Sequence, residues 1–162
     1  MKTTDTLTTL FSHNLWANGR LFEICAELSS EHMETTVSGT FGSIRDTLEH
    51  IARAERSYLS RISTGQRYHN PDDTVPMTIT DILEMVCDSG KGLIEWAHKV
   101  RSDDTVTVDW DGRSREIPKT IILTQVINHA TEHRAQVMVI LTQLGIQPPD
   151  LSSWTYFDEL EK

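Results

Sequence analysis

Apolar residues recur at steps of three and four in four stretches of the chain, the spacing that gives a helix one apolar face. The first stretch runs from about Asp5 to Ser29, and the second follows Ser43, a suitable N-cap, and breaks at Thr64-Gly65. This pattern predicts two long amphipathic helices. The apolar positions of the first are Leu7, Leu10, Phe11, Leu21, Phe22, Cys25 and Leu28.

A third helix is expected to start near Thr80 or Asp81 and to continue to about residue 97. It follows a linker at residues 69–76 that is rich in Asn, Pro and Asp. Gly90 and Gly92 interrupt the pattern. Each glycine is expected to weaken the helix by about 1 kcal/mol relative to alanine.

The period then changes from helical to alternating. Residues 105–110 and 113–117 alternate on either side of Asp111-Gly112, a dipeptide favoured where both residues of a tight turn need positive φ. We therefore predict a small β-hairpin at this point.

A fourth helix follows Pro118, with Thr120 as its expected cap, and ends at Gly145. The aromatic residues of the tail at 147–157 are expected to pack back on the helices. Four long helices with a hairpin between the third and the fourth predict an all-α fold, a four-helix bundle. We expect residues 1–162 to form a single domain.

The chain is acidic, with 24 Asp and Glu against 15 Lys and Arg and a formal net charge of -9. Nucleic acid is therefore not an expected partner, although Arg53, Arg56 and Arg61 form a local basic group. No apolar run is long enough to cross a membrane. The N-terminus lacks a basic segment followed by an apolar one, so we expect a cytoplasmic protein. Cys25 and Cys87 lie in apolar helical patterns and are expected to act as core residues.

His129 and His133 carry the strongest chemical signal. Four residues apart on a helix, their imidazoles point the same way, and both fall on the stripe that faces the core. His50 lies at the edge of the apolar face of the second helix and can reach inward. Three neutral imidazoles with a fourth position left to water are typical of an open catalytic site for Zn, Ni, Fe or Cu. Such an ion would activate a bound water or thiol.

Other residues admit less specific interpretations. Glu55 lies on the inner seam of the second helix, where we expect it to pair with an arginine of another helix, with orientation of a ligand imidazole as the alternative. Glu132 completes the inverted zinc-protease motif His-x-x-Glu-His, but it projects about 100° away from His133 and is expected to face solvent. The histidines expected at surface or interhelical positions are His13, His32, His69 and His98.

Four segments together resemble the DinB/YfiT-like superfamily of metal-binding four-helix bundles. They are residues 14–21 (NLWANGRL), 48–52 (LEHIA), 129–136 (HATEHRAQ), and the ending at 148–151 (PPDL) with the aromatic residues after it. The resemblance covers nearly the whole chain. Where the family often has Gly, this chain has Ala135, a change of one methyl group.

The resemblance implies that His50, His129 and His133 hold a divalent ion, commonly zinc or nickel. Family members of known activity mostly use small thiols in thiol-dependent S-transfer or isomerisation, and homodimers are common. It therefore implies a metal-dependent thiol S-transferase acting on a small electrophile. A metal-dependent hydrolase is one alternative.

Two further hypotheses involve no chemistry. A stress-related binding module would close the coordination sphere with a fourth protein ligand, for which Asp46 and Asn14 are the candidates. A metal-free bundle would satisfy its histidines with carboxylates and water, and His129→Leu would then be neutral or stabilising.

Overall fold

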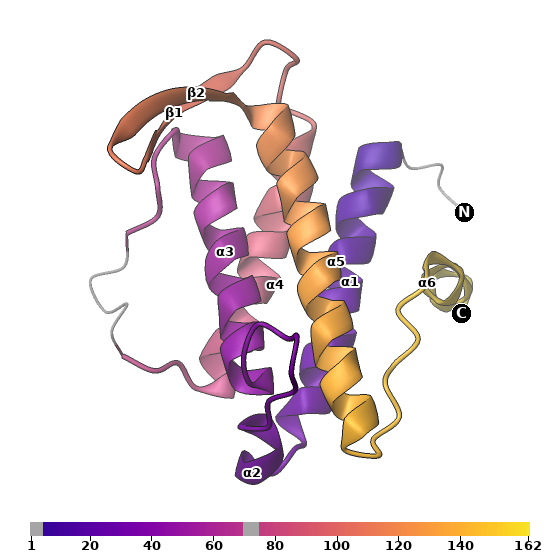
Figure 1. Ribbon diagram of the computed structural model, residues 1–162. Helices are drawn as coiled ribbons and strands as arrows, with labels where there is room; N and C mark the ends of the chain where they lie inside the picture. The colour runs from indigo at the N-terminus through magenta and orange to yellow at the C-terminus, as the bar shows by residue number, and fades with distance from the viewer. Residues whose placement is uncertain (1–4, 70–74) are drawn as a thin grey trace.

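The computed structural model describes residues 5–69 and 75–162. The four long helices are α1 (Thr6–Ala26), α3 (Ile44–Thr64), α4 (Ile79–Ala97) and α5 (Lys119–Gln143), and the shorter elements are α2 (Ser30–Met33), β1 (Thr105–Trp110), β2 (Arg113–Pro118) and α6 (Ser153–Leu160). The long helices lie side by side, with the β-hairpin across one end and α2 at the other (Figure 1). The predicted all-α bundle with its hairpin is confirmed. Residues 70–74, most of the predicted linker, lie outside the described residues.

Capping boxes start the two helices α3 and α4. The Ser43 hydroxyl accepts from the Asp46 backbone N–H, and the Asp46 carboxylate accepts from the Ser43 N–H, which confirms the predicted cap. Thr78 and Asp81 form the same reciprocal pair at the start of α4. Because the acidic partner occupies the third helical position, α4 begins at Ile79, slightly before the predicted start.

The β-hairpin leads directly into α5. Asp111 and Gly112 have φ values of 54° and 74°, as the turn prediction requires. The expectation that Thr120 caps α5 was wrong, because Pro118 ends β2 and stands at the N-cap without a side-chain hydrogen bond. The first backbone N–H of the helix, at Lys119, donates instead to the Asp104 carbonyl at 2.8 Å.

The tail packs back on α1, as predicted. The Trp16 indole N–H donates to Glu159 at 2.9 Å, and a His13 ring nitrogen lies 2.9 Å from the Leu151 carbonyl oxygen. The first two turns of α1 differ from the prediction, because Leu7 and Leu10 are exposed and burial begins only at the next apolar position.

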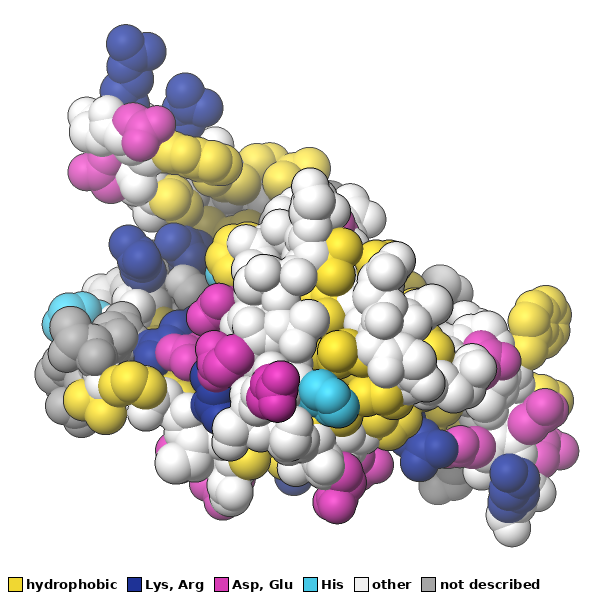
Figure 2. All heavy atoms as spheres, turned by 60° about the horizontal axis from the view of Figure 1, so that its bottom comes forward, with side chains coloured by type: hydrophobic (Ala, Val, Ile, Leu, Met, Phe, Trp, Pro, Cys, Tyr) yellow, Lys and Arg dark blue, Asp and Glu magenta, His cyan; other side chains and the backbone are white. Residues whose placement is uncertain are grey.

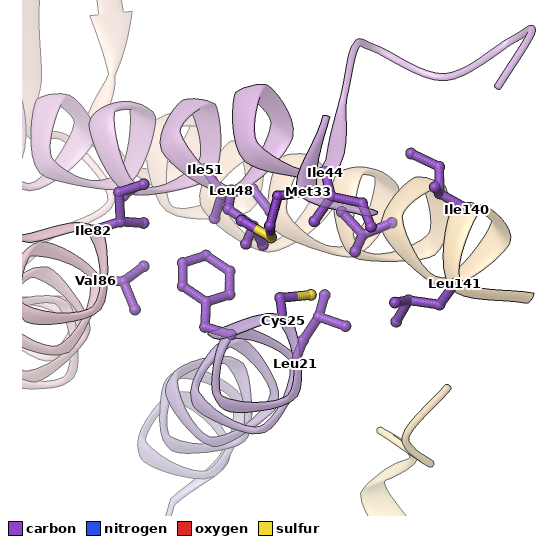
Figure 3. Packing of buried hydrophobic residues seen from close by; sticks show 13 residues of the cluster. Leu21, Cys25, Met33, Ile44, Leu48, Ile51, Ile82, Val86, Ile140 and Leu141 are labelled. Carbon is purple, nitrogen blue, oxygen red and sulfur yellow. The ribbon is translucent and has the colours of Figure 1, made fainter. Parts of the chain in front are cut away.

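The apolar core consists of two clusters. The cluster towards α2, part of which Figure 3 shows, is built chiefly from Leu21, Phe22, Cys25, Ile44, Leu48, Ile51, Ile82, Val86, Val137, Ile140 and Leu141. The cluster towards the hairpin contains Phe11, Leu59, Ile62, Leu93, Ala97, Val106, Ile122, Leu123 and Val126.

A layer of buried polar residues lies between the two clusters. Along α1, Asn14 and Asn18 fall between residues of one cluster and residues of the other, and Glu55 on α3 and Arg134 on α5 do the same on their helices. All four side chains are at least 95% buried, with exposures of 0–5%. Polar groups at this depth need partners from the protein itself.

The two glycines of α4 allow its neighbours to approach closely. A Cβ at Gly90 would lie 2.6 Å from a Leu15 carbon of α1, and one at Gly92 would lie 2.5 Å from a Leu59 carbon of α3. The glycines therefore weaken α4 locally but are required by its packing against both neighbours.

The cysteines differ in burial. Cys25 is fully buried, as expected, whereas Cys87 is only partly buried, and both thiols are free. Within the described part of the chain, no helix combines the length and the apolar character that a membrane span needs.

Candidate metal centre

The structure brings the three predicted histidines together between α3 and α5. One ring nitrogen from each of His50, His129 and His133 can be chosen so that all lie within 4.8 Å of one another. The Nε2 atoms of His129 and His50 are 2.9 Å apart, and the His133 ring centroid lies 4.7 Å from that of His50 and 4.5 Å from that of His129. In the described part of the chain, this group of potential metal ligands includes no carboxylate.

The local sequence explains this placement. Two histidines four residues apart share one face of α5, and His133 is 7% exposed, on the core stripe as predicted. His50 lies between Leu48 and Ile51, which are both fully buried, and is itself only partly buried. The cluster therefore has one side in the bundle and one side towards solvent.

A glutamine contacts the other nitrogen of His133. Nδ1 of His133 lies 2.9 Å from Oε1 of Gln136, and the same oxygen accepts from the backbone N–H of Phe41 at 3.1 Å. Phe41 belongs to the loop between α2 and α3. One side chain of α5 thus joins an imidazole to a distant loop.

Aromatic rings lie against the imidazoles from two directions. The Phe41 ring stacks on His50 at a centroid distance of 4.1 Å and 17° between planes, and it meets His133 edge-on at 5.2 Å. Tyr58 meets His129 edge-on at 5.8 Å. These rings restrict how far the imidazoles can turn.

Three residues that contact the histidines were not predicted to belong to the site. Gln136 is three residues after His133, a spacing that places both side chains on one helical face and could have identified the contact. Tyr58 is eight residues after His50, about two helical turns further along α3. Phe41 lies in a loop, where no periodicity gives a signal.

Two of the imidazoles, those of His50 and His129, are held in their neutral form. Burial, and secondarily the proximity of His133, lowers the pKa of His50. Burial together with both neighbouring histidines lowers the pKa of His129 to about 4. At neutral pH both rings therefore present lone pairs, the form in which histidine binds metals.

The donor set fits a divalent transition metal. Zn–N bonds of about 2.0–2.1 Å place two nitrogens of a tetrahedral site about 3.4 Å apart. The chosen nitrogens of the cluster lie within 4.8 Å of one another, and the Nε2 atoms of His129 and His50 lie 2.9 Å apart, distances close to this value. Nδ1 of His129 is buried without a hydrogen-bond partner in the described structure.

The two proposed fourth ligands are engaged elsewhere. The Asn14 amide donates to Glu55 at 2.8 Å, and its oxygen accepts from Arg134 at 2.8 Å. Asp46 is exposed and caps α3. Asp46 is not part of the three-histidine group that could hold a metal.

Glu55 is linked to Arg134 through two asparagines rather than by a direct ion pair. One Glu55 oxygen accepts from the amides of Asn14 and Asn18, each at 2.8 Å, and the oxygens of both asparagines accept from Arg134. The predicted pairing thus takes the form of a network through two asparagines. Burial raises the pKa of Glu55 to about 7, although the asparagine hydrogen bonds and Arg134 act in the opposite direction.

The remaining histidines and Glu132 lie outside the cluster, as predicted. Nε2 of His98 contacts the Thr8 hydroxyl at 2.6 Å, His13 contacts the tail, and Glu132 faces solvent. The exposed position of Glu132 gives the protease motif no structural support.

A hollow open to solvent lies beside His50, one of the three histidines of the cluster. Its volume is about 360 Å³, and it is lined by Phe41, Gly42, Asp46, Glu49, His50 and Arg53. Arg53 forms an ion pair with Glu49 at 2.7 Å in this wall. Acidic and basic side chains are also interspersed over the α2 end of the molecule, without a continuous basic face (Figure 2).

The chain is similar to known proteins of one family. The chain matches the family model described as DinB family over residues 1–159. It is 22% identical to Protein DinB of Bacillus subtilis over 166 residues, which cover 94% of this chain and 95% of that protein. It also shares the fold of a DinB-like protein from Bacillus cereus, with a TM-score of 0.62, 21% identity, and coverage of 85% of this chain and 90% of the other. Because the family model spans nearly the whole sequence, the chain belongs to the DinB family.

Proposed function

We propose that His50, His129 and His133 bind one divalent transition-metal ion, zinc or nickel, and that the protein is a metalloenzyme acting on small molecules. The observation that carries this proposal is the convergence of three imidazole nitrogens within 4.8 Å, in a group that includes no carboxylate of residues 5–69 and 75–162. Membership of the DinB family supports it. We retain a single domain, a cytoplasmic location and a homodimer as predictions.

The proposed reaction is thiol-dependent S-transfer. A metal bound by these histidines would lower the pKa of a coordinated thiol or water and so supply a nucleophile near neutral pH. The protein's own part is to hold three imidazoles together, to leave a coordination position open, and to admit small molecules through the hollow of about 360 Å³ beside His50. The net charge of -9 disfavours an anionic macromolecule as substrate.

The alternatives make different demands on the same residues. A non-catalytic module needs a fourth protein ligand, but Asn14 bonds to Glu55 and Arg134, and Asp46 caps α3. A metal-free bundle needs partners that stabilise the buried imidazoles, but Nδ1 of His129 has none in the described structure. Both observations favour an open metal site. The choice of S-transfer over hydrolysis rests on the family resemblance.

The first test is elemental analysis of untagged protein. We expect about one equivalent of transition metal in the wild type, loss of metal in His129→Ala and His133→Ala, and full retention in His32→Ala, a histidine of α2 outside the cluster. Metal-free wild type that resists loading with zinc or nickel would overturn the proposal.

Turnover is tested next with metal-loaded protein. A thiol supplied with a panel of alkylating electrophiles tests S-transfer, and activated esters and amides test hydrolysis. Activity with the thiol that is lost in His133→Ala supports the transferase. Inactivity in both assays would contradict an enzymatic role.

A further inference from the structure

Gln136 has a position that the proposed metal site does not by itself explain. Its side-chain oxygen contacts Nδ1 of His133 at 2.9 Å and the backbone N–H of Phe41 at 3.1 Å. We propose that Gln136 is a positioning residue that fixes the tautomer of His133 and couples the metal centre to residues 35–42, the loop between α2 and α3. The coupling to metal rests on the proposed function, whereas the tautomer does not.

The two contacts of Gln136 determine where the His133 proton lies. A backbone N–H can only donate, so the Gln136 atom facing Phe41 must be the amide oxygen. The same oxygen faces Nδ1 of His133, which must then carry a proton in order to form a hydrogen bond. In a neutral imidazole, Nε2 consequently keeps its lone pair. Nε2 is therefore the nitrogen of His133 available to a metal.

The same oxygen holds the loop that covers the cluster. Phe41 is 51% exposed, so core burial does not fix its ring. Its ring nevertheless contacts both His50 and His133, at 4.1 and 5.2 Å. An ion held by those histidines would fix two surfaces on which Phe41 rests, and Gln136 would fix its backbone. Metal binding and ordering of this loop are then one coupled event.

The loop also forms a wall of the hollow beside His50. Phe41 and Gly42 line it together with His50. A loop ordered by metal would give this hollow its shape only when the metal is present. Gln136 would thereby link loading of the centre to the shape of the hollow beside it.

The test compares Gln136→Leu, which removes the acceptor at similar size, with Gln136→Glu, which keeps an acceptor oxygen. Gln125→Leu, at an exposed position of the same helix, is the matched control. Zinc affinity is measured by competition with a chromophoric chelator, and protection of residues 35–42 by hydrogen exchange with and without zinc. We expect Gln136→Leu to lose about 10–100-fold in zinc affinity and to lose zinc-dependent protection, whereas Gln136→Glu and the control retain both.

A separate readout keeps the two proposals distinguishable. In metal-free protein, long-range ¹⁵N correlation spectra should show a proton on Nδ1 of His133 in the wild type and a shift towards Nε2 in Gln136→Leu. An unchanged tautomer in that variant, or wild-type zinc affinity and loop protection in it, would overturn the role of Gln136. Failure of wild-type protein to bind zinc would overturn the proposed metal site and the loop coupling, and would leave the tautomer to be tested by the spectra.

Discussion

Replacing Glu55 with glutamine should make the protein more stable at pH 8, although it removes a charge near a buried arginine. Glu55 is 0% exposed, and its second carboxyl oxygen has no partner in the described structure. Its first oxygen is bonded by two neutral amides rather than directly by Arg134. The desolvation cost of the carboxylate is thus only partly offset.

The magnitude follows from the pKa of this carboxyl. Burial raises the pKa of Glu55 from 4.5 to about 7, which corresponds to about 3 kcal/mol at about 1.4 kcal/mol per unit. Because the folded state holds the proton more tightly than the unfolded state, the contribution of Glu55 to the free energy of unfolding is greatest below about pH 4.5. It falls as the pH rises and becomes constant above about pH 7. Between pH 5 and pH 8 the expected fall is about 2–3 kcal/mol.

The assay is urea denaturation followed by circular dichroism, on metal-free wild type and Glu55→Gln from pH 5 to pH 8. The two proteins share every other titrating group, so their difference isolates Glu55. We expect nearly equal stability at pH 5 and an advantage of about 2–3 kcal/mol for Glu55→Gln at pH 8. The opposing effect is loss of a charge partner for Arg134, which can cost about 3–5 kcal/mol when a buried pair is broken. A variant that is less stable than wild type at pH 8, with a difference that shrinks as the pH is lowered, would show instead that the ionised Glu55 stabilises the folded protein.

Three further results are expected. Gly90→Ala should destabilise the protein by about 1–3 kcal/mol in urea denaturation, because the added methyl group would lie 2.6 Å from a leucine carbon. Gly19→Ala, whose methyl group would have nothing within 4 Å, should instead stabilise the protein by about 0.5–1 kcal/mol. A thiol reagent at pH 8 should modify Cys87 well before Cys25, since burial raises the pKa of the Cys25 thiol to about 12; equal rates would contradict this. Zinc at 100 times its Kd should raise the free energy of unfolding by about 3 kcal/mol in the wild type and not in His129→Ala, and equal gains would exclude the cluster as the site.

Much of the fold could be predicted because short-range chemistry determines it. Ser43 correctly predicted the start of α3, where it forms a capping box, and Asp111-Gly112 correctly predicted the hairpin turn. The cap at Thr120 failed because a strand runs directly into α5, and only the pairing of β1 with β2 determines where that strand ends. The exposure of Leu7 and Leu10 at the start of α1 could not be predicted either. Both follow the helical spacing of apolar residues, but the spacing does not show whether another element covers them.

In the candidate site, too, the residues on helices could be predicted and the contact with a loop could not. The spacing of His129 and His133 on a core stripe predicts that they share a face, and an amphipathic α3 brings His50 within reach. The contact between Gln136 and Phe41 joins residues 95 positions apart, and it depends on the path of a loop. Periodicity describes regular elements and therefore carries no information about such a contact.

Polar contacts in two directions determine how α5 is rotated in the bundle. His133 and Arg134 are adjacent, so their side chains project about 100° apart. Arg134 donates to the two asparagines of α1, whereas His133 and Gln136 contact each other and, through Gln136, the loop before α3. Apolar packing alone permits small rotations, but hydrogen bonds of 2.7–3.1 Å on both sides do not. The buried network on one side of α5 and the Gln136 contacts on the other thereby constrain the rotation of the helix that carries His129 and His133.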